Sequence, residues 1–224
     1  MDIKANLNRI KSSLANPNCQ LIAVSKTKPL SDIQAAYEAG IRDFGENKVQ
    51  ELTDKAPNLP KDIRWHMIGH LQRNKVKYIA PFVHLIHGVD SLRLLKQINK
   101  EGKKIDRKVP CLLQIHIAEE ESKFGLDGEE LKALLLGEEI RSMSHVEIKG
   151  LMGMATFTDE KEQIRKEFAQ LRKLRDSFDP DSLPPNVNLA ELSMGMSGDY
   201  EIAIEEGSSM VRIGSAIFGE RNYE

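Results

Sequence analysis

The chain has 224 residues, with 32 basic and 34 acidic side chains and a formal net charge of −2. This balance leaves no bulk electrostatic field that would draw in nucleic acid or an anionic membrane. A hydrophobic fraction of 40% is typical of a soluble globular protein, and every apolar run falls far short of the roughly 18 to 20 residues that cross a bilayer. Residues 1–11 do not resemble a signal peptide, and Cys19 and Cys111 are too few for a disulfide framework or a zinc cluster. The sequence therefore predicts a cytoplasmic protein with a single domain over residues 1–224.

Short apolar runs, most of them ended by Gly, Ser, Lys or Asp, predict eight strands that are buried on both faces. These strands are expected at residues 21–25, 43–46, 65–68, 85–89, 111–117, 150–155, 189–194 and 210–213.

Helical patterns separate the strands. Apolar residues at helical spacing predict an N-terminal helix over about residues 2–16, and further stripes predict helices over residues 129–140 and 159–178. Ser91 is suited to cap another helix, and Gly207 to end a short one after the seventh strand.

The alternation of strand and helix implies parallel pairing through right-handed crossovers. Eight such units favour a closed (β/α)8 TIM barrel, although roughly 250 residues is the typical length for that fold. The alternative is an open doubly wound sheet, which the absence of a G-x-G-x-x-G segment after the first strand disfavours. In a barrel, the functional residues are expected at the C-terminal ends of the strands.

Lys26 follows the first strand and, by alternation, shares a face with Ile22 and Val24. A lysine at a barrel rim is partly desolvated, which lowers its pKa and makes its amine a nucleophile for carbonyl groups. The alternative is a lysine that only begins a surface loop.

The segments after the seventh and eighth strands are rich in Gly and Ser, at residues 195–198 and 214–215. Such turns present backbone N–H groups at helix N-termini, and in barrels the loops after strands seven and eight frequently bind phosphate. The same residues are also ordinary turn and cap residues, so the pattern leaves both interpretations open.

The other polar candidates near strand ends are weaker. Asn47, after the second strand, is a helix cap or a ligand contact. His66 and His70 lie four apart, but on a strand this places them roughly 13 Å apart, too far to share a metal ion. His84 and His87 are an odd number apart and are expected on opposite faces. We therefore predict no metal site and a packing or hydrogen-bonding role for His66.

Six segments occur in a distinctive order: residues 23–29 (AVSKTKP), 43–47 (DFGEN), 65–75 (WHMIGHLQRNK), 150–152 (GLM), 192–197 (LSMGMS) and 211–214 (VRIG). Together they closely resemble the pyridoxal phosphate homeostasis protein family, single-domain relatives of alanine racemase. The resemblance covers essentially the whole chain. It departs from the family at Lys48, where a tyrosine is usual.

The resemblance implies a fold-type III barrel that holds pyridoxal 5′-phosphate as a Schiff base on Lys26. Arg212 is similar to the residue that faces the pyridine nitrogen, and Asn47 and His66 match positions near the cofactor ring. The implied phosphate cradle consists of Met196, Ser197, Gly214 and Ser215.

The resemblance also implies a role in intracellular cofactor homeostasis, by buffering or delivery to pyridoxal phosphate-dependent apo-enzymes, without substrate turnover. An arginine opposite the pyridine nitrogen can only donate a hydrogen bond, which leaves the ring a weak electron sink. A racemase needs a second base, which in alanine racemases is a tyrosine of a further C-terminal domain. Here the sequence ends soon after the last strand, and Tyr223 lies in a charged tail expected to be frayed. A monomer is expected on the same ground.

Two alternatives remain open. One is a pyridoxal phosphate-dependent amino-acid racemase, or a related enzyme, with an unrecognised second base. The other is a barrel enzyme that forms a Schiff base with a phosphorylated substrate and uses no cofactor.

Overall fold

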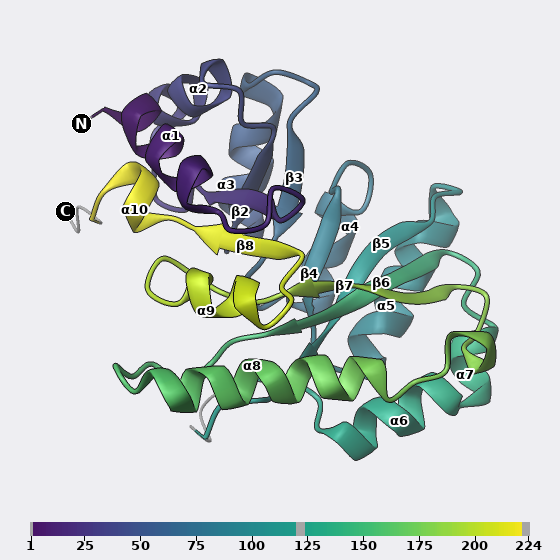
Figure 1. Cartoon of the computed structure of the whole chain (residues 1–224). Helices are drawn as coiled ribbons and strands as arrows, with labels where there is room; N and C mark the ends of the chain where they lie inside the picture. The colour runs from purple at the N-terminus through teal and green to yellow at the C-terminus, as the bar shows by residue number, and fades with distance from the viewer. Residues whose placement is uncertain (1, 120–123, 221–224) are drawn as a thin grey trace.

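The computed structural model describes residues 2–119 and 124–220, and Figure 1 shows their arrangement. Eight strands close into a barrel in which each strand lies between its neighbours in the sequence. Closure joins the first and last strands in parallel, with Gln20 opposite Met210 and Ala23 opposite Ile213. The (β/α)8 barrel is thus confirmed, and the open doubly wound sheet is excluded. The strands are β1 (Gln20–Val24), β2 (Asp43–Glu46), β3 (Arg64–Met67), β4 (Leu85–Val89), β5 (Val109–Ile115), β6 (Val146–Gly153), β7 (Val187–Ser193) and β8 (Met210–Ile213).

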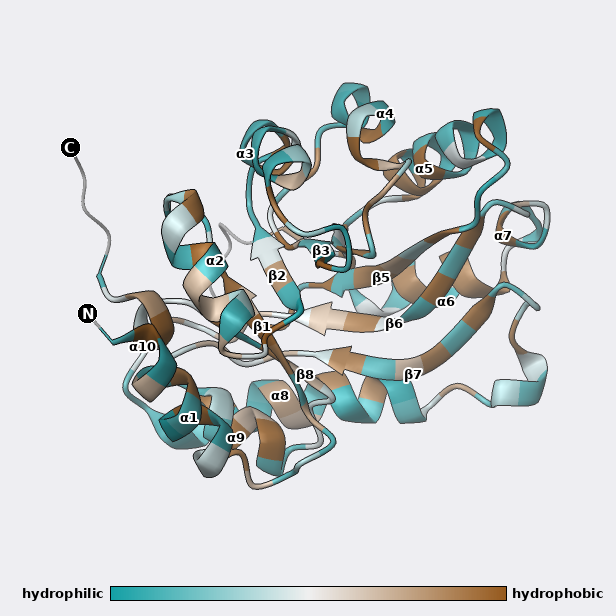
Figure 2. Ribbon diagram, turned by 90° about the horizontal axis from the view of Figure 1, so that it is seen from above, coloured by the Kyte–Doolittle hydropathy of each residue, from teal (hydrophilic) through white to brown (hydrophobic). Residues whose placement is uncertain are grey.

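Helices surround the strands, and Figure 2 shows hydrophobic segments along the strands and bands of both polarities on the helices. The α-helices are α1 (Ile3–Ser13), α2 (Leu30–Glu38), α3 (Val49–Lys55), α4 (Val76–Ile79), α5 (Leu92–Lys104), α6 (Gly128–Leu136), α7 (Glu138–Arg141), α8 (Lys161–Asp176), α9 (Tyr200–Glu205) and α10 (Ser215–Phe218). Three short 3-10 turns are η1 (Ala56–Asn58), η2 (Arg73–Lys75) and η3 (Pro180–Ser182). Within the described ranges, no helix is long and apolar enough to cross a membrane.

Some predicted boundaries are corrected. The helix expected over residues 129–140 is divided at Gly137, whose extended backbone ends α6 before α7 begins. The strand expected to begin at Gly150 begins four residues earlier, because the chain remains extended through the glycine. The N-terminal helix ends at Ser13, because the backbone of Leu14 is extended. Ser91 caps α5, as predicted. Tyr223 lies outside the described residues.

The buried side chains form two layers. A large apolar layer fills the space between the strands and the helices. A smaller cluster lies inside the barrel and draws one side chain from each of five strands: Ile22, Leu85, Leu112, Met152 and Met210. The interior also holds buried polar side chains from β2, β3, β4, β7 and β8, namely Asp43, His66, His87, Ser193 and Arg212. Because a buried polar group costs free energy unless it is hydrogen-bonded, the partners of these five residues matter.

Candidate functional site

A cavity of about 480 Å³ opens where the strands reach their C-terminal ends. Its walls come from the loops after β1, β2, β3, β6, β7 and β8. Seven of the eight site residues suggested by the sequence line it: Lys26, Asn47, Met196, Ser197, Arg212, Gly214 and Ser215. The eighth, His66, is fully buried and is not part of its wall.

Lys26 stands between two residues whose backbones are held in place. The carbonyl of Ser25 accepts a hydrogen bond from Lys55 Nζ at 2.9 Å, and the Ser25 hydroxyl donates to Glu46 Oε1 at 2.6 Å. On the other side, Thr27 N donates to Glu51 Oε2 at 2.7 Å. These contacts fix the chain on both sides of the lysine.

Thr27 adds local strain to this turn. Its φ of +62° lies in the left-handed region, which is unusual for a β-branched residue. The bond from its amide to Glu51 holds it there. A strained conformation retained by specific contacts is typical of functional sites, where it fixes the direction of a neighbouring side chain.

The two lysines of this segment have different roles. Lys28 also lines the cavity, but its Nζ donates to the carbonyls of Phe218 and Glu220, each at 2.9 Å. Lys28 therefore ties the β1 loop to the end of α10. Of the two lysines, Lys26 is the one that the sequence analysis predicts as the functional amine.

A buried ion pair supports the Lys26 turn from below. Glu46 is fully buried, and its Oε1 lies 2.9 Å from Lys55 Nζ. Burial raises the pKa of Glu46, and Lys55 and the Ser25 hydroxyl oppose that rise. Among the described residues, Glu46 Oε2 is one of two buried side-chain polar atoms without a hydrogen-bond partner.

The loops after β7 and β8 are joined to each other at the cavity. Gly214 N donates to Ser197 Oγ at 3.3 Å, and Arg212 N donates to Gly195 O at 3.0 Å. Gly195 has a φ of +95°, and a Cβ there would lie 2.6 Å from the Cβ of Ala203. Only glycine fits this close approach of the loop to α9.

Arg212 is the buried cation of the site, with 4% of its surface exposed. Its Nη1 donates to the carbonyl and to the hydroxyl of Ser193 at 2.7 and 2.6 Å, and its Nη2 donates to Gly153 O at 3.1 Å. Burial lowers the pKa of Arg212 to about 10. This value is still well above neutral pH, so the guanidinium remains charged.

His66 lies deeper in the barrel, on β3. Its Nε2 is 3.0 Å from Asp43 Oδ1, and its Nδ1 is 3.0 Å from His87 Nε2. This placement matches the hydrogen-bonding role expected for it. His84 and His87 both pack against the His66 ring, at 5.2 Å between centroids. The expectation that they face opposite ways is wrong, because His84 precedes β4 and does not follow the strand alternation.

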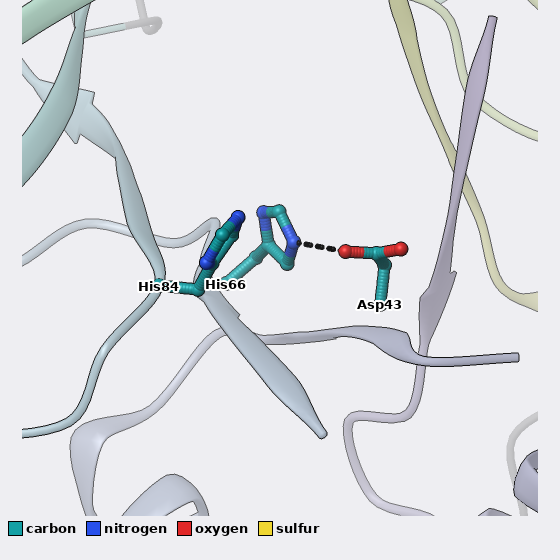
Figure 3. Close-up of side chains that lie close together, drawn as sticks. All are labelled: Asp43, His66 and His84. Carbon is teal, nitrogen blue, oxygen red and sulfur yellow. Dashed lines mark hydrogen bonds and ion pairs between the residues drawn. The ribbon is translucent and has the colours of Figure 1, made fainter. Parts of the chain in front are cut away.

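The structure also gathers three donor groups that the sequence did not suggest together. The side chains of Asp43, His66 and His84 each bring one ligand-type atom within 4.8 Å of the others. Figure 3 shows the three side chains close together, with a dashed line between His66 and Asp43. His70, the residue paired with His66 in the sequence argument, instead lies 3.2 Å from Asp90. The trio comes from three separate segments, so no sequence spacing could reveal it.

The fold and the cavity together define a class: a parallel (β/α)8 barrel with a lysine after the first strand and a buried arginine on the last. The alanine racemase N-terminal domain family matches residues 1–222. A solved alanine racemase of Clostridium difficile has a TM-score of 0.81 at 15% identity, covering 100% of this chain and 58% of that one. That likeness shows the shared fold.

Closer relatives identify the branch of this class. The pyridoxal phosphate homeostasis protein of Aquifex aeolicus (strain VF5) is 41% identical over 208 residues, covering 92% of this chain and 89% of the relative. A solved structure of PipY from Synechococcus elongatus PCC7942, described as having PLP bound, has a TM-score of 0.86 at 35% identity, covering 97% of this chain and 100% of that one. The chain belongs to the pyridoxal phosphate homeostasis protein family.

Proposed function

We propose that this chain binds pyridoxal 5′-phosphate in the cavity and serves in the homeostasis of that cofactor, by buffering or by delivery, without substrate turnover. One observation carries the proposal. A single cavity brings together Lys26, Arg212 and the paired loops after β7 and β8. The solved PipY relative with PLP bound and the names of the curated relatives support the same conclusion.

The residues present fit the group chemically. The cavity volume of about 480 Å³ lies within the range of small-molecule sites. Lys26 supplies an amine that condenses with an aldehyde to a Schiff base, with loss of water. The loops that carry Met196, Ser197, Gly214 and Ser215 supply the small-residue turns that suit a phosphate.

Arg212 would face the pyridine nitrogen, and Asn47 would contact the ring from the β2 loop. When bound, the cofactor supplies an electron sink whose strength depends on protonation of that nitrogen. A guanidinium has donors only, so Arg212 would donate to the nitrogen and leave it unprotonated. This arrangement disfavours transaminase-type chemistry, and a separate exchange test distinguishes homeostasis from racemisation.

The test is absorption spectroscopy on three proteins after addition of pyridoxal phosphate. The wild type is expected to show a visible Schiff-base band, and Lys26→Ala to lack it. Lys28→Ala is the matched control, because it removes a lysine two residues away that ties the loop to α10, and it should keep the band. Borohydride reduction followed by peptide mapping should place the cofactor on Lys26. A wild type without the band contradicts the proposal and favours a cofactor-free Schiff-base enzyme.

The absence of turnover is tested separately. The α-hydrogen of alanine and other amino acids should not exchange in D₂O at an enzymatic rate when the loaded protein is added. Exchange at ordinary turnover would favour the racemase alternative over homeostasis.

Three finer proposals complete the function. We propose a cytoplasmic protein, which the two buried, unpaired thiols Cys19 and Cys111 support because reduced cysteines suit a reducing compartment. We propose a monomer, which sedimentation would check, since the large exposed apolar side chains come from separate helices and loops.

We propose pyridoxal phosphate-dependent apo-enzymes as recipients, which is supported by the exposed Phe157 at the cavity wall.

A further inference from the structure

A continuous chain of hydrogen bonds runs through the barrel interior from Arg212 to the N-terminal ends of the strands. Arg212 Nη1 lies 2.6 Å from Ser193 Oγ, and Ser193 Oγ lies 2.8 Å from His87 Nδ1. The imidazole of His87 continues to that of His66 at 3.0 Å, and His66 continues to Asp43 at 3.0 Å. Every member is less than a tenth exposed.

The groups at the two ends of this hydrogen-bond chain fix the direction in which every hydrogen bond in it is donated. At one end, Arg212 can only donate. At the other, Arg64 and His66 hold the pKa of Asp43 well below its usual range, so the carboxylate can only accept. His66 must then donate from Nε2 to Asp43 and accept at Nδ1, and His87 must donate from Nε2 and accept from the Ser193 hydroxyl at Nδ1. Both imidazoles are neutral, in agreement with burial, which lowers the pKa of each.

The same geometry argues against a metal ion at Asp43, His66 and His84. Arg64 donates from Nε and Nη2 to the two oxygens of Asp43, at 2.7 and 2.5 Å. His66 Nε2 carries the proton that bonds Asp43. A dication there would have to displace that proton and sit beside a guanidinium. The trio is better explained as the end of the hydrogen-bond chain.

The hydrogen-bond chain also helps to stabilise the positive charge of the buried Arg212 guanidinium. The hydrogen bonds of Arg212 go to Ser193 and Gly153, and the charge of Asp199 opposes the effect of burial on its pKa. With all protons directed toward Asp43, every dipole in the chain places its negative end toward Arg212. Asp43 thereby adds to the stabilisation of the cation through three intermediate groups, beside the direct effect of Asp199.

We propose that Asp43, His66, His87 and Ser193 are positioning residues, an indirect ion pair that orients Arg212 and sets the strength of the hydrogen bond it gives to the ligand's ring nitrogen. This inference rests on the proposed function, because it assigns Arg212 to the ring of pyridoxal phosphate. It deepens that function by extending the determinants of cofactor binding to the opposite end of the barrel, beyond any residue of the cavity wall.

The first experiment needs no cofactor. Nitrogen NMR on protein labelled at histidine, with His66→Gln and His87→Gln for assignment, should show both rings neutral with the proton on Nε2 at pH 7. A proton on Nδ1 of either ring would reverse the direction of one hydrogen bond and contradict the proposed chain from Arg212 to Asp43. Added Zn²⁺ should leave these signals unchanged. A stoichiometric shift of the His66 and His84 signals would instead show a metal site and contradict the hydrogen-bond chain.

The second experiment uses pyridoxal phosphate labelled with ¹⁵N at the ring. Ser193→Ala should weaken cofactor binding by about tenfold, as expected for loss of a hydrogen bond to a charged group, and should shift the ring-nitrogen resonance. Ser193→Thr, which keeps the hydroxyl, should restore both. Ser208→Ala is the matched control, since Ser208 is equally buried and bonds the carbonyls of Leu192, Met194 and Met210 outside the chain.

Asp43→Asn provides a second variant that keeps the hydrogen bond and removes the charge. It should move the ring-nitrogen resonance in the same direction as Ser193→Ala. Equal resonances in wild type, Ser193→Ala and Asp43→Asn would overturn the inference. A wild type that binds no pyridoxal phosphate would instead overturn the proposed function, and the assigned role of Arg212 with it, while the histidine measurement still decides whether the chain exists.

Discussion

At the scale of single residues, the Lys26 turn depends on a charge balance below it. Lys55 satisfies the carbonyl of Ser25 and the carboxylate of Glu46, and also lies 3.0 Å from Glu51. Its side chain is almost completely buried, as is that of Glu46. The turn thus rests on groups whose loss would leave a charge unpaired in the interior.

Lys55→Met is expected to lower the free energy of unfolding by about 3 to 5 kcal/mol, the usual cost of breaking a buried pair on one side. Urea unfolding followed by circular dichroism measures this change. Lys55→Met combined with Glu46→Gln should recover much of the loss, because the second change removes the unpaired charge. A double variant no more stable than the single one would show that Lys55 acts through packing.

The residue scale also shows what sequence alone can reach. Lys26 and the Ser197 loop follow strand ends, and Arg212 lies next to the end of β8. A parallel barrel places the C-terminal ends of all strands on one face, so their meeting could be predicted. Ser193 and His87 lie 106 residues apart and meet only because of the register of β4 and β7 inside the barrel. Sequence spacing carries no information about that register, so the hydrogen bonds from His66 through His87 to Ser193 could not be predicted from the sequence.

At the scale of elements, β6 is the strand whose geometry departs most from regular pairing. The register of β6 shifts next to Lys149 against both β5 and β7. At this point Gly150 approaches β7 so closely that a Cβ would lie 1.9 Å from Glu191 O. The obstacle is backbone, which cannot move aside as a flexible side chain would. The same glycine explains the misplaced start of the predicted strand, since glycine usually signals a break and here marks a bulge.

Gly150→Ala is expected to destabilise the protein by about 2 kcal/mol or more, because the β6–β7 pairing must separate to admit the methyl group. The midpoint of thermal unfolding reports this loss. Gly128→Ala is the control, since the nearest atom to its Cβ is Leu174 Cδ1 at 3.7 Å and the position begins α6. Equal midpoints for the two variants would mean that β7 tolerates displacement at this bulge.

At the scale of the whole molecule, three histidines couple stability to pH. Burial lowers the pKa of His84 to about 4 and lowers those of His66 and His87 as well. In the unfolded chain these groups titrate near pH 6.5. Between about pH 6.5 and pH 4 the unfolded state therefore binds more protons, and stability falls as the pH falls. The raised pKa of Glu46 acts in the opposite direction above pH 4.5, but it is a single group.

We expect the urea midpoint to decrease steadily from pH 7 to pH 5. His84→Gln should flatten this dependence, because it removes one of the groups that the native state holds neutral. A midpoint independent of pH over this range would show that the histidines titrate alike in the folded and unfolded states.

The pairing of β1 with β8 has a consequence for synthesis of the chain. Strands β1 to β7 can each find a neighbour as they leave the ribosome, but one edge of β1 has no partner until residues 210–213 are made. An unpaired edge can associate with other chains. The cavity is equally late, because its wall needs Arg212, Gly214 and Ser215. The nascent chain can therefore neither protect its first strand nor accept a ligand until residues 210–215 have been made.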